Sequence, residues 1–445
     1  MTYYINPLLY FHSTNLDNNF AFNGLNGAVD VLPRDLAECL STNMGKYVDI
    51  TSEDIELLKE RSYIFSCEDD YKALRSQIEG YQRDFLEKEP YHISILPTFA
   101  CNLACPYCFE HTKPSIVRED TEYLRCIINA LHFFAEKGSI VLEFYGGEPL
   151  LPRNTPIIEG VLAECENLGI QNVGIITNGT YLKEFSHLLA HYSGIKFDIQ
   201  ITIDGPKNIH NKRRVSANVQ DSFTLIMDGI DSIIDNSNIS IQIRTNVDRE
   251  NAKHLTELYN FFEDKYAFYD NLVYYLTPTS NRDNPAEDVT EADIVHLVEE
   301  TLPHINGLKK AGGLHVLAYL YSLIDESESA LPMYSYCEGV RGKYFALAPD
   351  GNIYACSETV GLPQHRVGCF DSSSVMIDDD KLKKWTENSI AHRKECQNCA
   401  LGFICGGGCA LSNFMQTGEY CGKASCARTH CDVDEFFDYL RKRTF

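Results

Sequence analysis

Cysteine is the residue type in this chain whose spacing points most directly to chemistry. The 445 residues include 17 cysteines, of which three lie close together at Cys101, Cys105 and Cys108 and seven lie between Cys396 and Cys431. The N-terminal residues lack the basic and apolar regions of a secretory signal, so we expect a cytoplasmic location in which thiols stay reduced. Thiolates that bind metal are therefore favoured over disulfides, and two separate metal regions are predicted.

The first cysteine group has the spacing C-x3-C-x2-C and directly follows a predicted strand. A structural zinc site takes four protein ligands, whereas this run offers three thiolates. A 4Fe-4S cluster held by three cysteines keeps one iron open for an external ligand, and this is the favoured interpretation. The alternative is half of a zinc site that is completed from elsewhere in the chain.

A second motif follows one strand later at Gly146, Gly147, Glu148 and Pro149, and an aromatic residue, Tyr107, precedes the last cysteine of the first group. This combination resembles the radical S-adenosylmethionine (radical SAM) enzymes. The resemblance implies that S-adenosylmethionine (SAM) chelates the open iron, that Tyr107 lies near the adenine, and that the GGEP turn binds the methionine amino group. Glycines let a backbone approach a ligand closely, and a Glu148 carboxylate can accept from an ammonium.

Four further residues match positions that face the cofactor in such enzymes, namely Asn178, Thr202, Arg214 and Asn246. Each also has a structural interpretation, because TNG is a turn sequence and DGP ends a strand. We expect these residues to contact SAM, and we assign no catalytic residue beyond the cluster ligands.

The C-terminal cysteines follow a long pattern. Cys337 and Cys356 are joined by x13-Gly-x4, and a C-x2-C-x5-C-x3-C run begins at Cys396. The pattern resembles the SPASM extension of radical SAM enzymes, which carries two auxiliary 4Fe-4S clusters. The fragments CQNC and CGGGC alone would also fit a zinc ribbon.

The resemblance also implies the ligand sets, and with the first cluster it gives three 4Fe-4S clusters. One auxiliary cluster takes Cys337, Cys356 and Cys409. The other takes Cys396, Cys399, Cys405 and a late cysteine, for which Cys431 is favoured over Cys426, with Cys421 also available. No second cysteine lies within six residues of Cys337, so we hypothesise an open iron there, or closure by Cys369.

A repeated strand and helix pattern must position these residues. Six buried strand patterns alternate with helical patterns, which predicts a parallel α/β sheet, and polar or Gly-rich residues follow the strands where such folds place ligands. We predict a partial (β/α)6 TIM-like barrel, although an open doubly wound sheet fits the same pattern. The predicted segments are a winged-helix-like α+β leader-recognition module at 1–90, the barrel at 91–285, a helical bridge at 286–335 and the Cys-rich SPASM domain at 336–445.

Charge and hydropathy exclude several partners. The 63 acidic and 39 basic side chains give a net charge of −24. This charge repels phosphate backbones and anionic lipids, so we expect neither nucleic acid nor membrane as a partner. No apolar run approaches the roughly 18 residues of a membrane span.

The resemblance implies one-electron reduction of the first cluster, cleavage of SAM to methionine and a 5′-deoxyadenosyl radical, and hydrogen abstraction from the substrate. SPASM-bearing relatives mostly modify peptides or proteins. We therefore expect a ribosomal precursor peptide as substrate, with its leader bound to the N-terminal module by strand addition, and reduced flavodoxin or ferredoxin as electron donor.

Thioether formation from a Cys sulfur to a carbon is the favoured reaction. The alternatives are carbon-carbon (cyclophane) cross-linking, epimerisation, and the formylglycine-forming reaction of anaerobic sulfatase-maturing enzymes. Those enzymes carry Asp after the G-x4-C cysteine, where this chain has Ser357 and then Glu358. The non-enzyme alternative is a zinc-binding, Cys-rich interaction protein, and about 12 irons per chain would separate the two classes.

Overall fold

The computed structural model forms two compact units. It describes every residue except 14–16, 52, 109, 111–119, 217–218, 280–288, 299–301, 303–307, 309–315, 324–332, 423–425 and 445. The first unit comprises Met1–Glu89, His315–Arg341 and Lys384–Phe445, and the second comprises Pro90–Leu314 and Gly342–Lys383. No helix in the described part of the chain is long and apolar enough to cross a membrane.

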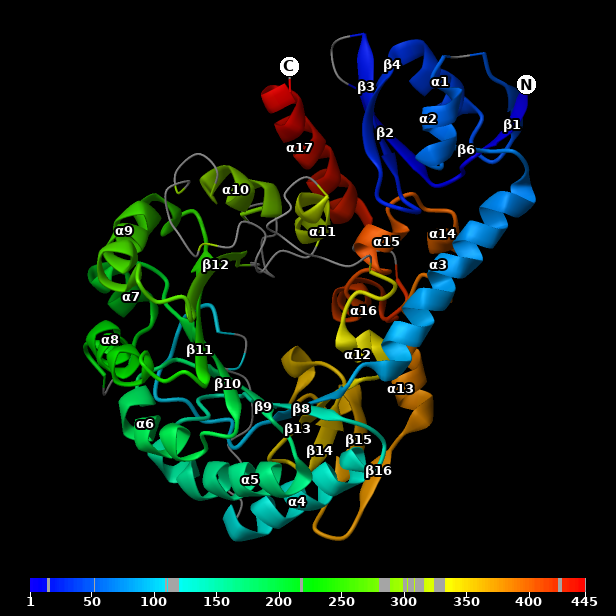
Figure 1. Cartoon of the computed structure of the whole chain (residues 1–445). Coiled ribbons are helices and arrows are strands. Elements are labelled where there is room, and N and C mark those ends of the chain that lie inside the picture. Colours follow the sequence, from blue (N-terminus) through cyan, green and yellow to red (C-terminus); the bar gives the residue numbers. More distant parts are fainter. Residues whose placement is uncertain are drawn as a thin grey trace. The chain divides into compact units, whose positions relative to one another are not determined.

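The second unit is built on one ten-stranded sheet, in which the six predicted strands are consecutive neighbours that pair in parallel. These strands are β7 (Tyr91–Ile95), β8 (Ile140–Phe144), β9 (Asn172–Thr177), β10 (Lys196–Thr202), β11 (Ile239–Val247) and β12 (Leu272–Pro278). The helices between them are α4 (Asp120–Ala135), α5 (Thr155–Leu168), α6 (Leu182–His191), α7 (Lys207–Arg213), α8 (Ser222–Ile233) and α9 (Leu255–Tyr266). Figure 1 shows these helices on the outer side of a curved, open sheet, which confirms the predicted partial barrel.

The strands alternate between a buried and a half-exposed face. Along β11 the isoleucines Ile239, Ile241 and Ile243 are buried, while Gln242 and Arg244, which alternate with them, are half-buried. Side chains on a strand point to opposite faces in turn, so the isoleucines pack together on one face and the polar residues lie on the other. The half-buried face of β11 is therefore its polar face.

Residues 342–383 extend this sheet rather than belonging with the remaining C-terminal residues. The strand β13 (Tyr344–Leu347) pairs in parallel with β7, and β14 (Asn352–Tyr354), β15 (Arg366–Phe370) and β16 (Val375–Ile377) continue antiparallel. Gly351 turns the chain between β13 and β14 with φ +77°. The predicted segment 336–445 is thus divided between the two units. Residues 342–383 belong to the sheet unit, because β13 supplies hydrogen-bond partners for the backbone edge of β7.

The first unit contains two small sheets and a set of helices. The sheets are β5-β1-β6 (Tyr47–Asp49, Thr2–Ile5, Ile64–Phe65) and β2-β3-β4 (Leu9–Ser13, Asn18–Asn23, Val29–Pro33). The helices are α1 (Arg34–Thr42), α2 (Ile55–Glu60), α3 (Glu68–Lys88), α11 (Val316–Ser322), α12 (Glu338–Arg341), α14 (Lys394–Gln397), α15 (Gly402–Cys405), α16 (Ala410–Thr417) and α17 (Cys426–Thr444). Phe437 of α17 packs its ring on Tyr10 and Phe20, so the last helix is part of the core beneath β2 and β3.

Candidate functional site

The GGEP turn after β8 lies against the loop that leads into the first cysteine group. The Gly147 and Glu148 N–H groups donate to the carbonyl oxygens of Thr98 and Ala100, at 3.3 and 2.9 Å. A Cβ on Gly147 would lie 2.3 Å from the Ala100 oxygen, so only glycine fits this approach. The turn therefore fixes the backbone immediately before Cys101.

The sulfur of Cys101 lies among hydrogen-bond donors. The Leu103 N–H donates to Sγ at 3.3 Å, and the Asn178 amide donates to it at 3.6 Å. The same Asn178 amide donates to Asn102, whose own amide donates to Thr180 at 2.9 Å. The turn after β9 thus orients the cysteine loop, and Asn178 is placed at the sulfur.

Glu148 is fully buried beneath this loop. Its Oε1 accepts from the Leu150 N–H and the Thr177 hydroxyl, and its Oε2 accepts from the Asn178 N–H at 2.7 Å. Burial raises the pKa of this carboxyl, while the three donors act in the opposite direction. The carboxylate ties the end of β8 to the end of β9, and Pro149 continues the same turn.

A charged cluster follows β10. The Tyr107 hydroxyl donates to the fully buried Asp204 carboxylate and accepts from Arg214 Nη1 at 2.8 Å. Arg213 lies over the Tyr107 ring, 5.3 Å from its centre, and binds Asp248 at 2.5 Å. The structure therefore brings the predicted residues Tyr107 and Arg214 together.

Asp204 was missed by sequence reasoning although it lies inside the IDGP motif. Its second oxygen accepts from the Asn246 N–H at 3.2 Å, and its carbonyl accepts from Asn251 at 2.8 Å. Thr202, the last residue of β10, is buried two residues before it. The ends of β10 and β11 are thus joined through one carboxylate, which a turn motif alone does not indicate.

The three thiols of the first group are close enough to affect one another. Burial is the main cause that raises the pKa of Cys105; Arg214 lowers it, and Asp204 and Cys108 raise it further. Desolvation likewise raises the pKa of Cys101 to about 12, with a smaller contribution from Cys105. Nevertheless, no three His, Cys, Asp or Glu side chains in the described part of the chain converge as ready ligands for a metal ion.

The second group gathers in the first unit. Burial is the main cause that raises the pKa of Cys396 to about 11, and the thiols of Cys405, Cys399 and Cys426 contribute. Cys426 affects Cys399 and Cys405 in the same way. Cys431 lies farther along α17 and is exposed. The structure therefore brings Cys426 to this group, where the sequence pattern favoured Cys431.

The cysteines predicted for the other auxiliary cluster are divided between the units. Cys337 and Cys409 lie in the first unit, and Cys409 is among the groups that, after burial, raise the pKa of Cys337 to about 11. Cys356 follows β14 in the second unit. Cys369 of β15 pairs with Asn352 of β14, the strand that precedes Cys356.

Polar residues of the inner barrel face form a further set that sequence reasoning did not identify. The Ser94 hydroxyl of β7 donates to Glu143 of β8 at 3.1 Å. The Tyr275 hydroxyl of β12 donates to Gln200 of β10. In the sequence these residues are indicated by the polar positions that alternate with apolar ones along each strand.

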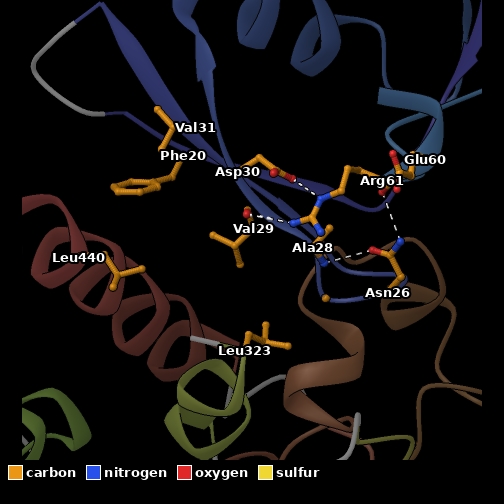
Figure 2. A pocket seen from close by; sticks show the side chains of 11 residues that line it. Phe20, Asn26, Ala28, Val29, Asp30, Val31, Glu60, Arg61, Leu323 and Leu440 are labelled. Carbon is orange, nitrogen blue, oxygen red and sulfur yellow. Dashed lines mark hydrogen bonds and ion pairs between the residues drawn. The ribbon is translucent and has the colours of Figure 1, made fainter. Parts of the chain in front are cut away.

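A groove of about 560 Å³ lies beside β4 in the first unit. Figure 2 shows Phe20 and Val29 of the β2-β3-β4 sheet on one side and Leu323 and Leu440 on the other. Arg61 closes one end, where its Nε binds Asp30 at 2.9 Å. Among the described strands β4 pairs only with β3, and its residues Val29, Asp30 and Val31 line this groove, where the Val29 carbonyl accepts from Arg61 Nη2 at 3.2 Å.

Comparisons with known proteins agree on the kind of domain. Residues 95–262 match the family model of the radical SAM superfamily. The chain is 23% identical over 322 residues to a cysteine-type anaerobic sulfatase-maturating enzyme of Clostridium novyi (strain NT), covering 69% of this chain and 84% of that protein. It is also 23% identical over 371 residues to a serine-type anaerobic sulfatase-maturating enzyme of Klebsiella aerogenes, covering 79% and 87%.

Two solved structures share the fold. The structure of native anSMEcpe with bound AdoMet and Cp18Cys peptide has a TM-score of 0.56 at 18% identity and covers 80% of this chain and 98% of that chain. The structure of Streptococcus suis SuiB bound to precursor peptide SuiA has a TM-score of 0.52 at 17% identity and covers 95% and 98%. The likeness to SuiB thus extends over nearly the whole chain.

Proposed function

We propose that this chain, which carries a radical SAM domain over residues 95–262, is a maturase that forms a thioether in a ribosomally made precursor peptide. The observation that carries the proposal is the groove of about 560 Å³ lined by Val29, Asp30 and Val31 of the edge strand β4, because an extended peptide can bind at a sheet edge by strand addition. The fold likeness to a protein bound to its precursor peptide, over 95% of this chain, supports it.

The donor chemistry fits a 4Fe-4S cluster at the strand ends. Cys101, Cys105 and Cys108 would hold three irons, because three thiols stand in one loop and N–H groups already point at the Cys101 sulfur. SAM bound at the fourth iron would supply, on reduction, an acceptor for a substrate hydrogen atom. An electron donor of the flavodoxin or ferredoxin type would supply the electron.

The chain's own residues would bind and orient this cofactor. Gly146 and Gly147 keep the GGEP backbone close to the cysteine loop, and Glu148 and Pro149 complete the turn. Tyr107 and Arg214 form one wall through Asp204, which also fixes the Asn246 backbone. Thr202 would lie at the floor between these groups. A fixed wall of this kind positions a ligand without reorganisation when it binds.

Four thiols would hold the second auxiliary cluster, and we propose Cys426 rather than Cys431 as the last ligand. Cys396, Cys399 and Cys405 are the others. The sequence pattern alone, by its resemblance to the SPASM extension, assigns Cys337, Cys356 and Cys409 to the first auxiliary cluster, with one iron open for the substrate thiolate. These clusters would accept the electron that remains after bond formation.

The atoms and electrons of thioether formation balance with the proposed clusters as electron acceptors. A C–H bond and an S–H bond of the peptide break, a C–S bond forms, and two protons and two electrons leave the substrate. Ser357 takes the place of the Asp base expected in the formylglycine-forming reaction, which favours the thioether. Sulfatase maturation is the second candidate, because the curated relatives named above carry that function.

The leader would add to β4 as a further strand, with apolar side chains against Phe20 and Leu440. Val31 lines the groove and is 41% exposed, so Val31→Asp is expected to weaken binding of a labelled leader peptide about tenfold or more. Leu57→Asp, at a similarly exposed position on α2, is the matched control and should bind normally. Equal binding by both variants would exclude this groove.

The decisive test of the reaction is co-expression with the small open reading frame nearest to the gene, followed by thiol alkylation and mass spectrometry of the peptide. The proposal predicts loss of two hydrogens per event and a Cys that is no longer alkylated, with neither change in Cys101→Ala. The same mass loss with every Cys alkylated would indicate a carbon-carbon cross-link instead. An unchanged peptide would contradict the proposed substrate.

A further inference from the structure

Arg393 is a buried cation at the second group of cysteines. It lies one turn before Cys396 and its side chain is 4% exposed. Its Nη1 donates to the carbonyl of Gly407 at 2.6 Å and to Asn388 Oδ1 at 3.3 Å. The guanidinium is thus fixed from one side by the CGGGC loop.

The other side of the guanidinium has no partner among the described residues. Both Nε and Nη2 are buried without a hydrogen-bond acceptor, and the structure shows no carboxylate paired with this charge. An unpaired buried cation costs several kcal/mol, so such a group is normally placed beside an anion. The neutral carbonyl and amide oxygens on its one satisfied side do not supply that charge.

Arg393 is held directly between segments that carry cysteines: the Cys396 N–H donates to its carbonyl at 3.0 Å, and its Nη1 binds Gly407 between Cys405 and Cys409. The charge of Arg393 acts on Cys396 and Cys399, where burial raises the thiol pKa and Arg393 lowers it. It acts in the same direction on Cys421. Four thiolates bound to a 4Fe-4S cluster would carry net negative charge at this place, which is the missing counter-charge.

We propose that Arg393 donates its Nε and Nη2 hydrogens to sulfur ligands of the second auxiliary cluster and thereby raises the reduction potential of that cluster. The proposal rests on the cluster assignment made above. Reduction adds a negative charge, so a buried cation beside the sulfurs stabilises the reduced state more than the oxidised state. Arg393 is in this sense a positioning and tuning residue for electron acceptance.

The packing of the backbone around Arg393 explains why its guanidinium stays in place. Gly407 adopts φ +93°, and a Cβ there would lie 3.0 Å from the Asn388 carbonyl, so the loop packs directly on this segment. Asn388 also donates to the Gly408 carbonyl at 2.7 Å. The loop between two predicted ligands, Cys405 and Cys409, is therefore built around the arginine.

The test is potentiometric titration of the anaerobically reconstituted protein, followed by electron paramagnetic resonance. A Cys405→Ala variant identifies the signal of the second auxiliary cluster. At the wild-type midpoint of that signal, Arg393→Gln is expected to show at least a tenfold lower ratio of reduced to oxidised cluster, which is 59 mV for one electron. Arg75→Gln, which removes a surface ion pair with Glu79 in the same unit, should leave the ratio unchanged.

Arg393→Lys keeps the charge but loses the planar fork, and it should shift the same signal in the same direction by a smaller amount. This variant carries the test if Arg393→Gln does not retain iron. An unchanged midpoint in every arginine variant that holds the cluster would overturn the inference. Absence of the second auxiliary signal from the wild-type protein would instead contradict the cluster assignment in the proposed function.

Discussion

The two cysteine regions are stabilised in different ways. The first group lies at the ends of parallel strands, where Gly147, Glu148 and Asn178 fix the loop through hydrogen bonds within the sheet unit. The second group lies among short helices and the CGGGC loop, around the buried side chains of Asn388 and Arg393. The sheet can position the first site before any metal binds, whereas we expect the second region to depend on its proposed cluster for much of its stability.

Removal of iron should therefore have its largest effect on the second region. We expect amide protons of residues 384–422 and 426–444 to exchange much faster in the metal-free protein, while those of β7 to β12 stay protected. Hydrogen exchange with mass spectrometry, before and after chelation, measures this. Equal loss of protection in both regions would refute the distinction.

At the first site, Gly147→Ala should be the most damaging substitution that adds a single methyl group. The new Cβ would lie 2.3 Å from the Ala100 oxygen, so the cysteine loop must move, at a cost of about 1–3 kcal/mol. Activity should be lost, because this loop carries the three cysteines that we propose hold the first cluster. Gly194→Ala, where nothing lies within 4 Å, is the control and should keep both stability and activity.

Asn178 and Asn413 allow the same substitution to be compared in the two cysteine regions. Asn178→Ala removes the amide at the Cys101 sulfur, and we expect activity to fall about 10- to 100-fold with little change in unfolding. Asn413 is fully buried and donates to Asn388 and to the Tyr420 carbonyl, so Asn413→Ala should lower stability by about 1–3 kcal/mol and reduce iron content. Thermal melts, iron assays and rates together separate the two patterns. A loss of stability in Asn178→Ala, together with a loss of activity but not of stability in Asn413→Ala, would contradict this comparison.

The smallest expected effect is the change with pH in the stability of the metal-free protein. Burial raises the pKa of Cys337 and Cys396 to about 11. A raised thiol pKa favours the neutral folded form, so this stabilisation is complete below the ordinary thiol pKa and is lost as pH rises toward 11. Melting temperatures of metal-free protein should fall between about pH 9 and 11, more steeply than in a Cys337→Ser, Cys396→Ser variant.

The sequence was sufficient for the regular part of this molecule. All six parallel strands were predicted because their alternating patterns are long and are separated by helical periods, as β11 illustrates. The gathering of polar residues at the strand ends was predicted as well, since parallel strands share one edge. Asn178, Tyr107 and Arg214 lie there.

Other features depend on contacts between distant segments. Asp204 accepts from Tyr107 and Asn246, which lie 97 and 42 residues away, and no local pattern reports such a contact. The pairing of β13 with β7 joins segments that are far apart in sequence, so the last segment was not expected to extend the sheet. The proposed choice of Cys426 over Cys431 likewise rests on contacts of α17 with the distant Cys396, Cys399 and Cys405, which no local pattern reports.

The iron and sulfide content of the anaerobically purified protein, measured beside its Cys101→Ala variant, tests the central claim most directly. The account predicts about 12 irons per wild-type chain and about 8 in the variant, with the second region still folded. A colourless protein that holds zinc in place of iron would contradict the account, as would an iron content that is unaffected by the loss of Cys101.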